Sequence, residues 1–353
     1  MNMSVGSFES QFGRTIKFLS GYRAKYTGQI NAARSALQYR SEEIARPASF
    51  YSFAKDAFEY AMMIEELEQS GVQLKNVLAL DIGGMEATTS RLLKAEGIAA
   101  EAHCVDIHDY SQQLTTEQFY RFLTRLRVSS LIAPWSVRFN FQEHFDYSVT
   151  RRSRFHNIRN TAGTATGLDE YFSCGFLEMR EEVKYGLVSA LLCLPYFPLK
   201  EFYQKLSAVI AKGGYFFFLS DYWWSHNNST GLIGHFPWCA QRLTEADFFR
   251  YFEREHPEDL EVARQRYRYY HNNEEHPTLS DHIKVAESHG FRLLACRRHI
   301  AREHDGERNL VTPEELENVI NIADVLEDIH AFREDVCAAD LRTSFVSAIF
   351  VRN

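Results

Sequence analysis

The chain has 353 residues, of which 45% are hydrophobic and 24% are charged, and its formal net charge is −8. This composition is ordinary for a globular protein, and the length allows one large domain or two. The acidic balance argues against a protein that coats nucleic acid, because such proteins present a basic face. We therefore expect no nucleic-acid partner.

The six cysteines form no CxxC pair, and several lie in apolar runs, which is typical of buried thiols in a reducing compartment. The N-terminus lacks the apolar core of a signal peptide. The longest apolar run, residues 187–199, is short and interrupted by proline, so we expect no bilayer span and no membrane partner. These features predict a cytoplasmic protein.

Residues 8–70 are predicted to form helices, the last of which stops at Gly71. From residue 76 onward, strand and helix signals alternate. Strands are predicted at 76–81, 101–106, 169–174, 185–194, 215–220, 291–300 and 343–352. Helices are predicted at 86–97, at 115–126 behind a capping-box pair of Thr115 and Gln118, at 199–214, at 280–289 and from 312 onward.

This alternation predicts an α/β fold with a parallel sheet covered on both faces. Two stretches, 127–168 and 221–279, do not fit a minimal alternating pattern and are interpreted as insertions. Extra segments beside strand ends often build substrate pockets.

Two glycines, Gly83 and Gly84, follow the first predicted strand, where open parallel sheets bind ligands. Asp106 ends the second strand, and a carboxylate there can accept hydrogen bonds from both hydroxyls of a ribose. The pattern therefore predicts a nucleoside-containing cofactor.

Dinucleotide-binding enzymes carry G-x-G-x-x-G, because backbone amides must approach a pyrophosphate at a helix N-terminus. Here Met85 and Ala87 stand where later glycines are wanted, and Glu86 adds negative charge at the helix start. A cofactor without phosphates and with a cationic centre, such as S-adenosylmethionine, fits these residues better.

The stretches "LALDIGG" (78–84), "HCVDIHDY" (103–110), 185–218 and 343–352 resemble the class I S-adenosylmethionine-dependent methyltransferases. The resemblance implies a Rossmann-like seven-stranded sheet with an N-terminal helical region and helical insertions. It also implies that the glycine turn approaches the methionine part of S-adenosylmethionine, that Asp106 binds the ribose and that Ile107 flanks the adenine. The predicted cofactor-binding residues are Asp81, Gly83, Gly84, Asp106, Ile107, Phe176 and Cys193.

The segment 220–243 is predicted to face the methyl acceptor, which we expect to be a small molecule. Its aromatic residues Tyr222, Trp223, Trp224 and Trp238 are candidates to surround a sulfonium, with Arg152 as a clamp for a substrate carboxylate. His226, His235 or Asp221 are candidate bases for an oxygen or nitrogen acceptor. A lid or hydrophobic plug is an open alternative for the aromatic residues. No metal site is predicted.

Residues 221–252 and 276–291 resemble the bacterial methylthiohydroxybutyrate S-methyltransferases of dimethylsulfoniopropionate synthesis. This implies methyl transfer to the thioether of 4-methylthio-2-hydroxybutyrate. It also implies that residues 1–72 cap the cofactor or form a homodimer interface, beside a methyltransferase domain at 73–353. The alternatives are an O-methyltransferase with a His base, a non-catalytic nucleoside-binding relative and a disfavoured NAD-type oxidoreductase.

Overall fold

The computed structural model describes residues 4–11, 13–20, 48–132, 167–224, 236–273, 275–299, 303–304, 310–311, 317 and 320–353. The chain divides into two compact units. We call the first the sheet unit; it comprises Ser41–Ser220, His282–Arg297 and Ser347–Asn353. The second unit comprises Met1–Arg40, Asp221–Asp281 and Arg298–Val346, so the predicted insertion 221–279 falls in it, and the predicted region 1–72 is divided between the two units.

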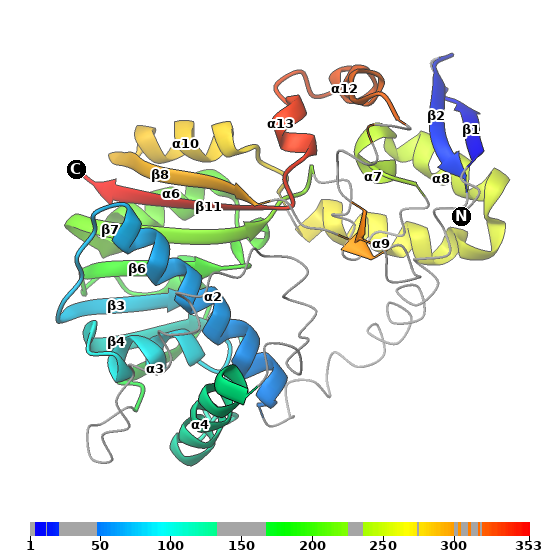
Figure 1. Cartoon of the computed structure of the whole chain (residues 1–353). Coiled ribbons are helices and arrows are strands. Elements are labelled where there is room, and N and C mark those ends of the chain that lie inside the picture. Colours follow the sequence, from blue (N-terminus) through cyan, green and yellow to red (C-terminus); the bar gives the residue numbers. More distant parts are fainter. Residues whose placement is uncertain are drawn as a thin grey trace. The chain divides into compact units, whose positions relative to one another are not determined.

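A seven-stranded sheet confirms the predicted α/β fold (Figure 1). Its order is β5 (Glu170–Ser173), β4 (Ala99–Asp106), β3 (Val77–Ile82), β6 (Tyr185–Leu191), β7 (Ile210–Asp221), β11 (Phe345–Arg352) and β8 (Phe291–His299). The pairs β3–β4, β3–β6, β4–β5 and β6–β7 are parallel. In Figure 1 the arrow of β11 runs opposite to that of β8. Buried apolar runs such as the one in β3 are expected of strands covered on both faces.

The helices of the sheet unit are α2 (Phe50–Gln69), α3 (Thr88–Ala95), α4 (Thr116–Ile132), α6 (Leu199–Val209) and α10 (Leu279–Ser288). Among them, α2 precedes the first strand of the sheet and the others lie between strands in the chain. The connection β3–α3–β4 moves one way along the sheet and β6–α6–β7 moves the other way. Because parallel crossovers are right-handed, α3 and α6 cover opposite faces, and the strand order reverses between β3 and β6.

Local signals explain several helix ends. In α4 the Thr115 N–H donates to Gln118 Oε1 (2.9 Å) and the Gln118 N–H donates to Thr115 Oγ1 (3.2 Å), which confirms the capping box. Helix α2 ends before Gly71, which has a positive φ of 77°, as its sequence predicts. The predicted helix from residue 312 begins outside the described residues.

The prediction of helices throughout 8–70 is wrong at its start. Residues Ser4–Glu9 (β1) and Thr15–Ser20 (β2) form an antiparallel hairpin. Phe8, Ile16 and Phe18 are buried, which is a strand period of two. The residues between or beside them that the structure describes are exposed: Ser7, Glu9, Thr15 and Lys17. Phe8 and Phe18 both pack edge-on against Tyr251, so tertiary packing within the second unit overrides the local signal.

The predicted helix 199–214 is also too long, because the strand β7 begins at Ile210. Pairing with β6 shifts from Tyr185↔Ile210 to Leu187↔Tyr215. Gly213, at a positive φ of 72°, lies in this shift. The two glycines therefore form an irregularity inside a strand instead of closing a helix.

The second unit is smaller and mostly helical. Besides the hairpin it contains α7 (Cys239–Arg242), α8 (Glu245–Glu255), α9 (Leu260–Asn273), α12 (Ile322–His330), α13 (Ala338–Leu341) and the short strands β9 (Glu303–His304) and β10 (Leu310–Val311). Short 3₁₀ turns lie at Phe176–Glu178 and Leu194–Tyr196 in the sheet unit and at Pro257–Asp259 in the second.

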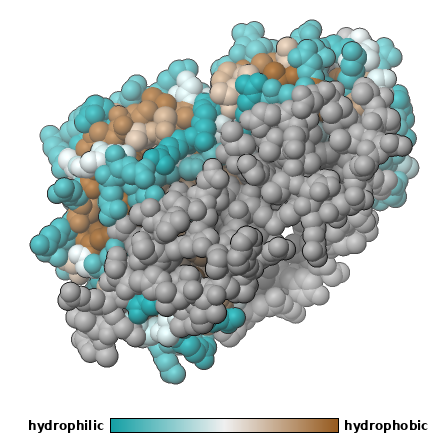
Figure 2. Space-filling model, viewed as in Figure 1, coloured by the Kyte–Doolittle hydropathy of each residue, from teal (hydrophilic) through white to brown (hydrophobic). Residues whose placement is uncertain are grey.

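The coloured surface in Figure 2 mixes hydrophilic side chains with hydrophobic patches. Among the residues that the structure describes, the exposed large apolar side chains are Met85, Ile107, Leu177, Tyr196 and Phe332. Three of these, Met85, Ile107 and Tyr196, line a single pocket of the sheet unit. Within the described ranges, no helix is both long and apolar enough to pass through a membrane.

Candidate functional site

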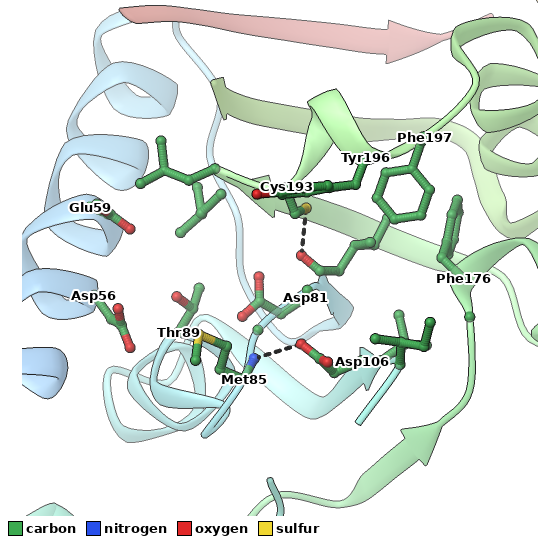
Figure 3. Close-up of a pocket in the computed structure, with 18 of the residues that line it drawn as sticks. Asp56, Glu59, Asp81, Met85, Thr89, Asp106, Phe176, Cys193, Tyr196 and Phe197 are labelled. Carbon is green, nitrogen blue, oxygen red and sulfur yellow. Dashed lines mark hydrogen bonds between the residues drawn. The ribbon is translucent and has the colours of Figure 1, made fainter. Parts of the chain in front are cut away.

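A pocket of about 390 Å³ opens where β3, β4 and β6 end (Figure 3). It is lined by Lys55, Asp56, Glu59, Asp81, Ile82, Gly83, Gly84, Met85, Thr89, Val105, Asp106, Ile107, Gly175, Phe176, Leu191, Leu192, Cys193, Tyr196 and Phe197. All seven predicted cofactor-binding residues are among them. The pocket lies at the carboxyl ends of the strands where their order reverses, the usual ligand position in an open α/β sheet.

The glycine turn forms a wall of the pocket that has no room for side chains. A Cβ on Gly84 would lie 2.4 Å from Asp81 Oδ2, and a Cβ on Gly83 would lie 2.7 Å from Cys193 Cβ. The Gly83 N–H donates to the Val105 carbonyl over 2.8 Å, which ties the turn to β4. A ligand can therefore approach the backbone of the turn closely.

Left-handed backbone angles recur beyond Gly83. Met85 and Ala87 have φ angles of 44° and 59°, and Leu192, across the pocket in the chain after β6, has 59°. Such angles cost a non-glycine residue about 1–2 kcal/mol. Met85 and Ala87, which stand where the dinucleotide pattern has glycines, thus adopt the backbone conformation that glycine favours. Two of the strained residues, Met85 and Leu192, line the pocket, and backbone strain is often found at functional sites.

Asp81 is a buried carboxylic acid at the end of β3, with 2% of its surface exposed. Its Oδ1 accepts a hydrogen bond from Ser189 Oγ on β6 over 2.7 Å. Burial raises the pKa of Asp81 to about 7, and the charges of Asp56 and Asp106 add to this rise, against the lowering effect of the Ser189 hydrogen bond. A cation beside Asp81 would stabilise its ionised form.

Asp106 ends β4 and is held by two backbone donors. The Met85 N–H donates to Oδ2 (3.2 Å) and the His108 N–H donates to Oδ1 (3.1 Å). Each oxygen therefore keeps acceptor capacity for a ligand hydroxyl. Burial raises the pKa of Asp106, and the two backbone hydrogen bonds oppose the rise.

Tyr171 on β5 supports this arrangement, although the sequence did not single it out. Its hydroxyl lies 3.0 Å from the carbonyl oxygens of both Met85 and His108, and it accepts a hydrogen bond from the Tyr110 N–H over 3.2 Å. One hydroxyl thus joins the loop after β3 to the loop after β4. No local pattern distinguishes such a tyrosine from one in the core.

Helix α2 contributes three charged residues that the sequence reading treated as part of a helical cap: Lys55, Asp56 and Glu59. Glu59 is buried, and Lys55 Nζ lies 3.6 Å from its Oε1. Burial, followed by the charge of Glu59, raises the pKa of Asp56 to about 8, while Lys55 lowers it. The signal that could have found them is an acidic residue on the buried face of an amphipathic helix.

The predicted acceptor residues that the structure describes lie in the second unit. Tyr222, Trp223, Trp224 and Trp238 are buried. Trp238 Nε1–H donates to the Trp224 carbonyl (3.2 Å), and the Trp223 ring stacks on His276 with centroids 3.7 Å apart. The Tyr222 hydroxyl donates to Asp340 Oδ1 over 2.5 Å. Each of these contacts is made within the protein, and contact of these side chains with a substrate stays a prediction.

Of the other predicted residues, the structure describes Asp221 alone. Asp221 is the last residue of β7 and is partly buried. His226, His235 and Arg152 lie outside the described residues. Across the part of the chain that the structure describes, no three His, Cys, Asp or Glu side chains are grouped so that they could hold a metal ion.

No model of a protein family matches the sequence, and no curated protein matches it. Among solved structures, the S-adenosylmethionine-dependent methyltransferase from Mesorhizobium loti superposes with a TM-score of 0.39 at 11% identity, covering 82% of this chain and 96% of that chain. Geranyl diphosphate C-methyltransferase from Streptomyces coelicolor A3(2), in complex with Mg²⁺, geranyl diphosphate and S-adenosyl-L-homocysteine, gives 0.37 at 10% identity, with coverages of 84% and 78%. The N-methyltransferase NodS from Bradyrhizobium japonicum WM9 gives 0.33 at 9% identity, with coverages of 85% and 97%.

Proposed function

We propose that the pocket binds S-adenosylmethionine and that the protein transfers its methyl group to a small-molecule acceptor. The observation that carries the proposal is the charge of the pocket. Four carboxyl side chains, Asp56, Glu59, Asp81 and Asp106, line it beside one lysine, and the pKa values of the three aspartates are raised. Such a pocket favours a cationic nucleoside and disfavours the pyrophosphate of a dinucleotide.

The residues fit this cofactor group by group. Asp106 keeps acceptor capacity for ribose hydroxyls, and the glycine turn leaves room for the adjoining chain. Ile107 and Phe176 supply apolar surface for a base. When bound, the cofactor supplies an electrophilic methyl group on a sulfonium, which an acceptor lone pair takes by in-line displacement. The protein's contribution to such a step is alignment and the exclusion of water.

For the acceptor we propose a carboxylated thioether, such as 4-methylthio-2-hydroxybutyrate, which would become a sulfonium. The resemblance of residues 221–252 supports it. No histidine is among the described residues that line the pocket, and a thioether needs no base. The competing proposals are O-methylation with His226 or His235 as the base and nucleoside binding without catalysis.

Calorimetry on the full chain with S-adenosylmethionine, S-adenosylhomocysteine and NAD tests the cofactor. We expect both adenosyl ligands to bind and NAD to fail. Asp106→Ala should weaken binding by about 1.5–3 kcal/mol, or roughly 10- to 150-fold, the loss expected for charge-assisted hydrogen bonds. Asp109→Ala is the matched control, because Asp109 is exposed and does not line the pocket. Equal affinities for all three proteins would overturn the proposed site.

A methyl-labelled donor tested against thioether acids and hydroxylated acids identifies the acceptor. A rate that is flat from about pH 6 to 9 would support the thioether, because its lone pair needs no deprotonation. A rate that rises with a histidine-like ionisation would instead support the O-methyltransferase. Cofactor binding without turnover on any acceptor would favour the non-catalytic alternative.

A further inference from the structure

We propose that helix α2 holds the amino-acid end of the cofactor, with Lys55 binding its carboxylate and Asp56 and Glu59 binding its ammonium group. This inference rests on the proposed function and assigns a subsite within the same pocket. It also assigns one end of the pocket to the nucleoside and the opposite end to the amino acid.

The arrangement of the carboxyl groups in the pocket gives this direction. In Figure 3 Asp106 and Phe176 lie on one side of Asp81, and Asp56 and Glu59 on α2 lie on the other. The side with Asp106 follows β4, where a ribose fits. A ligand that extends from there past Asp81 and the glycine turn therefore reaches α2.

The chemistry of α2 at this place matches a zwitterion. Lys55 lies four residues and Asp56 three residues before Glu59, so each can share a helix face with Glu59, and all three line the pocket. That face presents one ammonium and two carboxyl groups, of which Glu59 is buried. An α-amino acid offers the complementary set, a carboxylate and an ammonium on one carbon. Burial raises the pKa of Asp56, while Lys55 and a hydrogen bond with Thr88 oppose the rise, and a ligand cation beside Asp56 would stabilise its ionised form further.

Side-chain hydrogen bonds hold helix α2 at its start and near its middle. Ser49 caps its start, with Ser49 Oγ accepting from the Ser52 N–H over 3.0 Å. Tyr60 anchors the helix further along, because its hydroxyl donates to Glu96, the residue after α3. The charged face thus belongs to a rigid element packed within the sheet unit, which suits ligand positioning.

Three ligands that differ in their charged groups distinguish the carboxylate subsite from the ammonium subsite. S-adenosylmethionine carries both amino-acid charges, its decarboxylated form keeps only the ammonium, and 5′-methylthioadenosine has neither. Binding is measured for the wild type, Lys55→Met, Asp56→Asn and Glu68→Gln, the last being a charge control at an exposed site on the same helix.

We expect Lys55→Met to weaken S-adenosylmethionine at least tenfold and its decarboxylated form less than twofold. Asp56→Asn should weaken both at least tenfold, and neither variant should change 5′-methylthioadenosine binding more than twofold. Equal losses for all three ligands would show that α2 only shapes the pocket, and no loss for S-adenosylmethionine would place its amino-acid end elsewhere. Either result overturns the inference.

Failure of the proposed function looks different. If wild-type protein binds none of the three ligands, the cofactor assignment itself is wrong, and the inference falls with it. If the wild type binds all three and Asp106→Ala weakens all three, the cofactor assignment stands, and the α2 variants alone decide the inference.

Discussion

The two units treat buried charge in opposite ways. In the second unit the buried Arg242 donates to Asp328 through Nε (3.0 Å), and its Nη2 lies 2.8 Å from the same carboxylate. Asp340 receives hydrogen bonds from Tyr222, the Cys337 N–H and Arg298, which outweigh burial and lower its pKa. Burial raises the pKa of Asp328, and Arg242 and Arg14 oppose the rise. Both carboxylates therefore have cationic partners inside the protein, as expected of structural ion pairs.

In the pocket of the sheet unit the carboxyl groups instead raise one another's pKa. Asp56 and Asp106 both act on Asp81 in this direction, and Glu59 acts on Asp56. The difference teaches that a buried acid is a functional signal when its neighbours repel its charge, and a structural one when they compensate it. The pocket gains stabilisation when a cation arrives.

The largest expected effect is in the second unit. Arg242→Met removes the closer cationic partner of the buried Asp328 and leaves Arg14, whose Nη2 lies 3.3 Å from Asp328 Oδ1, so the free energy of unfolding should fall by about 3 kcal/mol. Urea denaturation measures it. Arg254→Met, at an exposed ion pair with Glu255, should cost less than about 1 kcal/mol.

Adding Asp328→Asn to Arg242→Met should recover part of the lost stability, because the buried charge that has lost Arg242 disappears. If the double variant is no more stable than Arg242→Met, packing and not charge explains the loss. That outcome would remove the contrast between the two units.

The next largest effect is in the pocket, where we expect a substitution to raise the free energy of unfolding instead of lowering it. The pKa of Asp81, raised by burial to about 7, exceeds the ordinary value near 3.9. The folded chain therefore binds this proton more tightly than the unfolded chain, and the free energy of unfolding falls as pH rises from about 4 to 7. Asp81→Asn should remove this fall and stabilise the unliganded protein at pH 8 by on the order of a few kcal/mol.

Thermal melting of the unliganded protein from pH 4 to 8 checks this. Asp109→Asn is the control, since hydrogen bonds from Ser111 lower the pKa of that exposed acid and its removal should not relieve the fall. Identical pH profiles for Asp81→Asn and the wild type would contradict the view that the pocket stores unfavourable charge. The stabilised variant should also bind S-adenosylmethionine more weakly.

The smallest effect concerns the loops around Asp106. Tyr171→Phe removes a hydroxyl that joins Met85, His108 and Tyr110, so we expect a loss of about 1 kcal/mol in binding, or roughly fivefold in affinity. Calorimetry measures the affinity, and a melt under the same conditions reports stability. An unchanged affinity would mean that the loops hold Asp106 without this brace.

The sequence identified much of the sheet unit because its signals are local. The apolar run before Gly83 predicted β3, and Thr115 with Gln118 predicted the start of α4. Asp106 could be placed beside the glycine turn because parallel strands end at the same edge of a sheet. The seven residues gathered in the pocket follow from the same rule.

The sequence alone determined the fold class, the seven-stranded sheet that its resemblance implies and the residues that follow the strand ends. Only the tertiary structure decided that Phe8, Ile16 and Phe18 make a hairpin, that the buried face of α2 brings acids to the pocket, and that Tyr171 joins two loops. The reason is physical: periodicity and turn chemistry act between near neighbours in the chain. Burial, charge repulsion and bridging hydrogen bonds depend on which distant segments meet.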